Sequence, residues 1–145
     1  MTDASDEPKP GYDLDMEKFY KDLRFGEEYE SRLVNILKSS KVEVKTERDW
    51  WMTTGNVCFE LRYRGKPSGL STTEADWWFH ILSHGGDIIC ILAFPVERLR
   101  LAVDKLVKDG VAKVKRGGDR MDSEFALVPL RCLYELNVAA INCCR

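Results

Sequence analysis

The stretch WWFHILSHGGDIICILAFPVERLRLAVDKLVKDG, residues 77–110, contains two apolar runs followed at once by an amphipathic segment. Residues 77–82 and 88–94 are almost continuously apolar and are separated by a polar segment with two glycines, which predicts two strands buried on both faces of a sheet. Pro95 then opens a helix that Gly110 is placed to end. The apolar stripe of this helix consists of Val96, Leu99, Val103, Leu106 and Val107.

The residues upstream of this stretch predict one more helix and two more strands. Apolar side chains recur at helical spacing from Phe25 to Leu37. Residues 41–45 and 56–64 alternate with period two on either side of a polar loop, and we expect them to form the arms of a long hairpin. Residues 71–74 have the spacing of a capping box, which predicts one short helical turn.

Downstream, residues 111–115 predict a basic strand and residues 125–130 a last strand, with a glycine turn between them. The order of helix, strands, helix and strands predicts the α/β class, with a mixed central β-sheet flanked by helices. Residues 1–11 contain two prolines among acidic and small residues and predict a flexible acidic leader. We expect residues 12–145 to form a single α/β domain.

Composition and charge exclude several classes of protein. A chain of 145 residues with 44% hydrophobic residues can bury a core of its own, which excludes a wholly disordered protein. It has no apolar run long enough to span a membrane, and its acidic start is unlike a signal peptide, so we expect a cytoplasmic protein with no membrane partner. Five cysteines without a Cys-x-x-Cys pair argue against a disulfide scaffold or a zinc finger.

One face of the predicted hairpin carries charged residues that could bind a metal ion. Strand alternation places Glu43 and Lys45 on one side of the first arm and Glu60 on one side of the second. If the apolar faces of the arms coincide, the two carboxylates share one site, as a hard cation such as Mg²⁺ requires. The alternative is an ordinary half-exposed hairpin whose charged residues form weak cross-strand pairs.

Several short motifs resemble the PD-(D/E)xK nuclease superfamily, in which a helix precedes a hairpin that carries (D/E)xK. Residues 43–46 read EVKT, and Glu60 ends a strand that begins after the TGN of residues 54–56. The segments GKPSG at 65–69 and TTEADW at 72–77 are similar to those of small phage-type relatives. The resemblance implies a restriction-endonuclease-like core, Mg²⁺ or Mn²⁺, DNA as partner and, for a phage-encoded protein, the host cytoplasm. It is compatible with a homodimer.

The motif is incomplete, because no acidic residue lies between Ser31 and Lys41, where the superfamily places an Asp. One registration uses Glu43 and Lys45 as (D/E)xK and takes the second carboxylate from Glu60. The other puts Glu43 in the Asp position and uses Glu60 to Arg62 as a degenerate motif. We prefer the first, because lysine can change its protonation state whereas arginine stays charged. Glu30 resembles a helix glutamate that many members carry near the metal, and it is equally explained as a solvated helix acid.

Further residues near these strands are candidates for contacting DNA. Arg62, Arg64 and Lys66 lead into a loop in which Ser68 and free backbone N–H groups could contact phosphates, although a plain tight turn is an equal explanation. The loop does not match a nucleotide P-loop. Trp50, in the loop between the two arms, could stack on an unpaired base.

These observations lead to a hypothesis and two alternatives. The hypothesis is a Mg²⁺-dependent endonuclease that hydrolyses DNA phosphodiester bonds, including the form of a branched-DNA or Holliday-junction resolvase, with Glu43, Lys45 and Glu60 as the catalytic residues. The first alternative is a catalytically inactive nucleic-acid-binding module of the same fold. The second is a protein-interaction module.

Overall fold

The computed structural model describes residues 15–133, and the predicted leader at residues 1–11 lies outside them. The chain divides into two compact units, Met1–Lys38 and Ser39–Arg145. In the first unit, helix α1 spans Met16–Ser39 and so begins nine residues before the predicted apolar pattern. The Asp15 carboxylate accepts hydrogen bonds at 3.1 Å from the N–H groups of Glu17 and Lys18, which caps this helix start.

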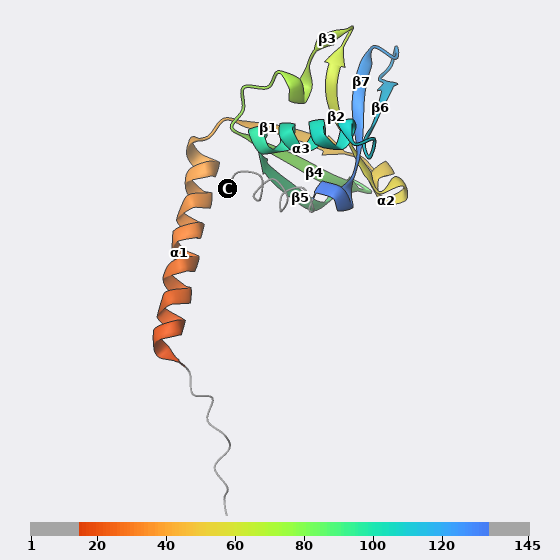
Figure 1. Ribbon diagram of the computed structural model, residues 1–145. Helices are drawn as coiled ribbons and strands as arrows, with labels where there is room; N and C mark the ends of the chain where they lie inside the picture. The colour runs from red at the N-terminus through yellow and green to blue at the C-terminus, as the bar shows by residue number, and fades with distance from the viewer. Residues whose placement is uncertain (1–14, 134–145) are drawn as a thin grey trace, which may run out of the picture. The chain divides into compact units, whose positions relative to one another are not determined.

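The second unit is a mixed α/β fold built from two sheets (Figure 1). The first sheet has the order β1-β4-β5, with β1 at Val42–Glu47, β4 at Trp77–His84 and β5 at Asp87–Pro95. β1 runs parallel to β4, and β5 runs antiparallel to it. The second sheet is antiparallel in the order β3-β2-β7-β6, with β2 at Asn56–Tyr63, β3 at Lys66–Pro67, β6 at Lys113–Gly117 and β7 at Ser123–Pro129.

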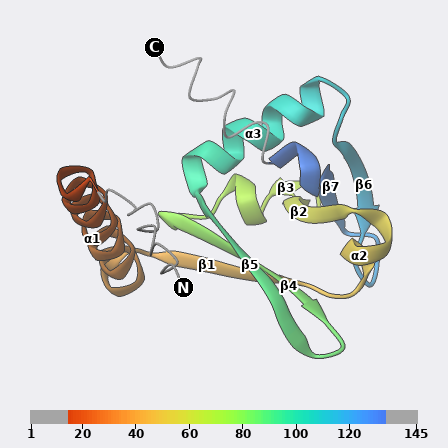
Figure 2. The same ribbon diagram turned by 90° about the horizontal axis from the view of Figure 1, so that it is seen from below.

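The predicted hairpin between residues 41–45 and 56–64 is wrong. β1 pairs with β4, in the register Val42↔Trp77, whereas β2 pairs with β3 and β7. The short helix α2, Trp50–Thr54, connects β1 to β2 across the two sheets, as Figure 2 shows. Alternation along a strand determines which residues share a face, but it does not determine the neighbouring strand.

Helix α3, Val96–Lys108, follows Pro95 as predicted and contacts β4 and β5 of one sheet and β7 of the other. Its predicted stripe is buried except for Val107, which is partly buried, and Leu99 and Val103 are each only 1% exposed. The core continues into the sheets through Phe59 and Trp78, whose ring centroids are 5.9 Å apart. Helix and sheets therefore enclose one hydrophobic core in this unit.

Two local predictions differ from the structure. β4 is buried on one face only, and β5 is an edge strand with Ile88, Ile89 and Ile91 more than half exposed, so neither strand is buried on both faces. The predicted helical turn at residues 71–74 lies earlier, as the 3-10 helix η1 at Gly69–Ser71. The prediction of a mixed α/β fold with a mixed sheet is nevertheless confirmed. Within residues 15–133, no helix is both long and apolar enough to cross a membrane.

Candidate functional site

A cavity of about 290 Å³ lies where the two sheets meet. Its walls come from β1 and β4 of the first sheet, from β2 and β7 of the second, and from η1. The lining combines carboxylates, a lysine and a histidine with aromatic and small side chains. The lining residues are Lys45, Thr46, Glu47, Cys58, Glu60, Gly69, Trp78, His80 and Phe125.

Alternate residues of β1 bring charge to this cavity. Lys45 and Glu47 both line it, two positions apart on the same side of the strand. Glu43 has the same parity, and its Oε1 atom lies 2.8 Å from Lys45 Nζ. Thr73 Oγ1 donates to the other Glu43 oxygen at 3.3 Å. The predicted pair of Glu43 and Lys45 is therefore an ion pair whose lysine faces the cavity.

Glu60 reaches the same cavity from β2 and is held by two hydroxyl groups. Ser68 Oγ donates to Glu60 Oε1 at 2.7 Å, and Ser123 Oγ donates to Oε2 at 3.0 Å. The loop after β2 can approach this closely because residue 69 is glycine: a Cβ there would lie 2.5 Å from the Glu60 carbonyl oxygen. Ser68, which the sequence suggested as a phosphate contact, thus donates its hydroxyl hydrogen to the Glu60 carboxylate.

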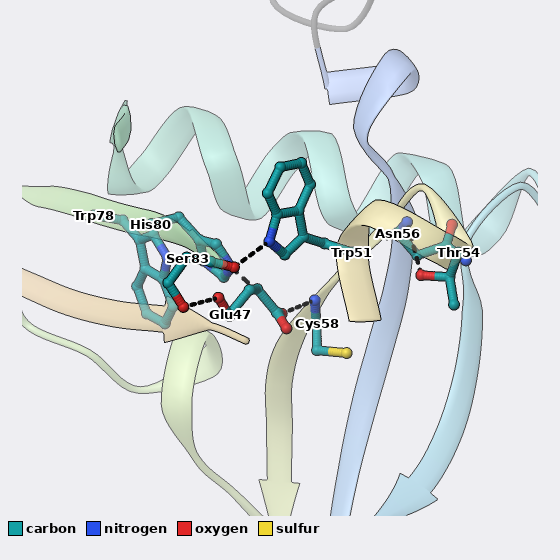
Figure 3. Close-up of polar contacts among 8 residues, drawn as sticks. All are labelled: Glu47, Trp51, Thr54, Asn56, Cys58, Trp78, His80 and Ser83. Atoms are coloured by element: carbon teal, nitrogen blue, oxygen red, sulfur yellow. Dashed lines mark hydrogen bonds and ion pairs between the residues drawn. The ribbon is translucent and has the colours of Figure 1, made fainter. Parts of the chain in front are cut away.

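The cavity wall contains a series of polar contacts among Trp78, His80 and Glu47 that the sequence did not predict (Figure 3). Trp78 Nε1–H donates to His80 Nδ1 at 3.1 Å, and this donation leaves the proton of a neutral imidazole on Nε2. His80 is 1% exposed, and its Nε2 atom lies 3.4 Å from Glu47 Oε1 without hydrogen-bond geometry. Glu47 also accepts a hydrogen bond from the backbone N–H of Cys58. Glu47 could have been found from the sequence, because it continues the alternation of Glu43 and Lys45.

Cys58 lines the cavity as a protonated thiol. Partial burial, together with the nearby Glu47 carboxylate, raises the pKa of the Cys58 thiol from 9.0 to about 11. A thiolate is the reactive form of cysteine, and a pKa this high leaves almost none at neutral pH. The raised pKa of the Cys58 thiol therefore argues against nucleophilic catalysis by this cysteine.

Of the other predicted DNA contacts, Arg62, Arg64 and Lys66 lie on the hairpin of β2 and β3, and Trp50 lies on α2. Arg62 lies near the end of β2 and forms an ion pair with Glu124 at 3.9 Å, and Arg64 lies in the turn after β2 and forms one with Asp122 at 3.1 Å. Lys66 is exposed on β3. Trp50 is 76% exposed on α2, whereas its neighbour Trp51 is half-buried and donates to the Ser83 carbonyl at 2.8 Å.

The predicted Mg²⁺ site would use carboxylate oxygen atoms as its protein ligands. Among residues 15–133 no three His, Cys, Asp or Glu side chains are grouped closely enough to hold an ion by themselves. Glu30 lies on α1, in the other compact unit. Glu47 and Glu60 still supply hard carboxylate oxygens to one cavity, and Mg²⁺ typically needs only one or two carboxylates together with water and substrate phosphates. The donor set thus fits Mg²⁺ chemistry but not a closed structural site.

Comparisons of the chain with protein-family models, with curated proteins and with solved structures found no match.

Proposed function

We propose that this protein is a Mg²⁺-dependent endonuclease that hydrolyses DNA phosphodiester bonds at the cavity between its two sheets. The observation that carries the proposal is that Lys45 and Glu60 line one cavity although they belong to different sheets. Both were selected from the sequence for the same chemistry. The resemblance of residues 43–46 to the (D/E)xK motif supports the same assignment.

Each charged residue of the cavity has a role suited to this reaction. Bound Mg²⁺ would polarise the scissile phosphate and lower the pKa of the attacking water. Glu60, oriented by Ser68 and Ser123, and Glu47 present the carboxylate oxygens that would hold the ion. The Lys45 ammonium neutralises charge that develops on the phosphate, and Glu43 keeps its side chain in position.

The test is nicking of supercoiled plasmid DNA with Mg²⁺ and with EDTA. We expect Mg²⁺-dependent nicking in the wild type and its loss in Lys45→Ala, Glu43→Ala and Glu60→Gln. Lys108→Ala, which removes an exposed charge at the end of α3, is the control and should keep full activity. Full activity in Lys45→Ala or Glu60→Gln would overturn the proposal.

A second candidate function is a nucleic-acid-binding module without catalysis. It is favoured by one observation: both oxygens of Glu43 and of Glu60 already contact protein groups. In that case plasmid DNA stays intact at any Mg²⁺ concentration. DNA binding survives the substitutions at Glu43 and Glu60, and it falls steeply with salt because phosphate contacts release counterions.

A further inference from the structure

The face of the second sheet that carries Glu60 continues across two more strands to β6. Residues directly opposite each other in an antiparallel pair share a face. Glu60 is paired with Phe125, and Phe125 with Lys115, so these three form one row across the sheet. Cys58, Leu127 and Lys113 form the adjacent row. Lys113 and Lys115 therefore lie on the same sheet face as the cavity residues Cys58, Glu60 and Phe125.

Arg62, one of the two arginines predicted to contact DNA, lies on the opposite face. A β-bulge between Glu60 and Arg62 shifts the register, so that Arg62 pairs with Glu124 rather than with Ser123. Glu124 also has Arg116 of β6 opposite it, and both arginines lie 3.9 Å from its carboxylate. One extra residue thus turns Arg62 away from the face of Glu60 and places it beside a neutralising acid.

Lys113 and Lys115 have the properties of phosphate contacts. Both are exposed, and neither forms an ion pair with any residue of the described part of the chain. Strands in a sheet are about 4.8 Å apart, so Lys115 stands roughly 10 Å from Glu60, two strands away. A DNA backbone that places one phosphate at the cavity and runs across the sheet toward β6 would bring neighbouring phosphates over these lysines.

We propose that Lys113 and Lys115 bind the DNA backbone next to the phosphate held at the cavity, and that they, rather than Arg62, form the main cationic contact on this face. This inference rests on the proposed function, because that function places a DNA phosphate at the cavity. Lysines also protect edge strands from pairing with other chains, and β6 is an edge strand. Edge protection alone requires no affinity for DNA, so binding measurements separate the two roles.

The experiment measures binding of a fluorescein-labelled DNA duplex to the full chain by fluorescence anisotropy. EDTA is present throughout so that no cleavage occurs, and the salt concentration is varied. Lys113→Gln/Lys115→Gln is compared with Arg98→Gln/Lys108→Gln, a control that removes two exposed positive charges from α3. Glutamine keeps the side chains polar, and circular dichroism checks that each variant folds.

We expect Lys113→Gln/Lys115→Gln to reduce the slope of log affinity against log salt by about two, since each phosphate contact contributes about 0.9. We also expect this double variant to bind the duplex at least about tenfold more weakly than the wild type near 0.1 M salt. The control should change the slope by much less. Equal slopes in the two double variants would overturn this inference while leaving the proposed function intact. Absence of any wild-type binding at low salt would instead overturn the proposed function, and the inference with it.

Discussion

Gly69, the first residue of η1, lines the candidate site and packs closely against Glu60. It has a φ of +54°, and a Cβ at this position would lie 2.8 Å from the Glu60 Cβ as well as 2.5 Å from the Glu60 carbonyl oxygen. Only glycine avoids both the strained backbone and the collision. The position of Glu60 in the cavity therefore depends on a residue with no functional group.

We expect Gly69→Ala to destabilise the protein by about 3 kcal/mol or more, because the left-handed backbone and the contact with Glu60 are both penalised. Gly65→Ala is the matched control: its φ is +75°, but no atom lies within 4 Å of the added Cβ. That variant should lose only about 1 kcal/mol. Urea unfolding measures both values, and equal losses would show that the contact with Glu60 is unimportant.

Cys58 should make stability depend on pH. Its thiol pKa is about 11 in the folded protein, above the ordinary value of 9.0, so the folded state holds the proton more tightly than the unfolded chain. This contribution is complete below pH 9 and is lost as the pH rises from about 9 to 11. Because Cys58 is only partly buried, we expect a loss of about 1 kcal/mol over that range.

The measurement is urea unfolding at several pH values for the wild type and for Cys58→Ala. The variant lacks the thiol, so its free energy of unfolding should fall less between pH 9 and 11 than that of the wild type. Other groups that titrate in this range are common to both proteins and cancel in the difference. Parallel pH profiles would show that the thiol pKa is not raised.

At the scale of elements, helix α3 joins the two sheets through one of its faces. Leu99 is 1% exposed and Leu101 is 64% exposed, although they are two residues apart in the same helix. We expect Leu99→Ala to cost about 2–5 kcal/mol, because it leaves a cavity in the core. Leu101→Ala should change stability by less than about 0.5 kcal/mol. Thermal or urea unfolding of the two variants tests this, and similar losses would mean that α3 does not pack as described.

The local sequence pattern predicted strands but not which strands pair with each other. The alternation of residues 41–45 and 56–64 correctly predicted two strands and the shared side of Glu43 and Lys45, but it wrongly placed Arg62 on the face of Glu60. It could not show that β1 pairs with β4, more than thirty residues away, because period-two patterns in all strands are alike. The sequence also could not predict the β-bulge that turns Arg62 away from Glu60, because the bulge depends on the register of β2 against β7.

At the scale of the whole molecule, charge is divided unevenly along the chain. Residues 1–30 contain ten acidic and four basic residues, and residues 31–145 contain 14 acidic and 18 basic residues. The net charges are therefore −6 and +4. A negative segment attached to a positive one weakens the attraction of the latter for phosphate, and salt screens this effect.

We expect deletion of residues 1–11, which contain three acidic residues and one lysine, to strengthen DNA binding at low salt. The gain should disappear as the salt concentration rises, because the interaction is long-range and screened. Anisotropy titrations of the full chain and of the shortened chain measure it. An affinity that does not change at low salt would show that the leader has no electrostatic effect on the binding surface.

The sequence by itself determined the α/β class, most of the strands, the apolar stripe of α3 and the alternation that places Glu43 and Lys45 on one side of β1. These properties depend on residues that are neighbours along the chain, and their periodicity is visible there. Only the tertiary structure decided that Lys45, Glu47 and Glu60 line one cavity and that His80 lies next to Glu47. The same is true of the face that Lys113 and Lys115 share with Glu60. Those relations depend on which strands pair and in which register, and long-range packing sets both.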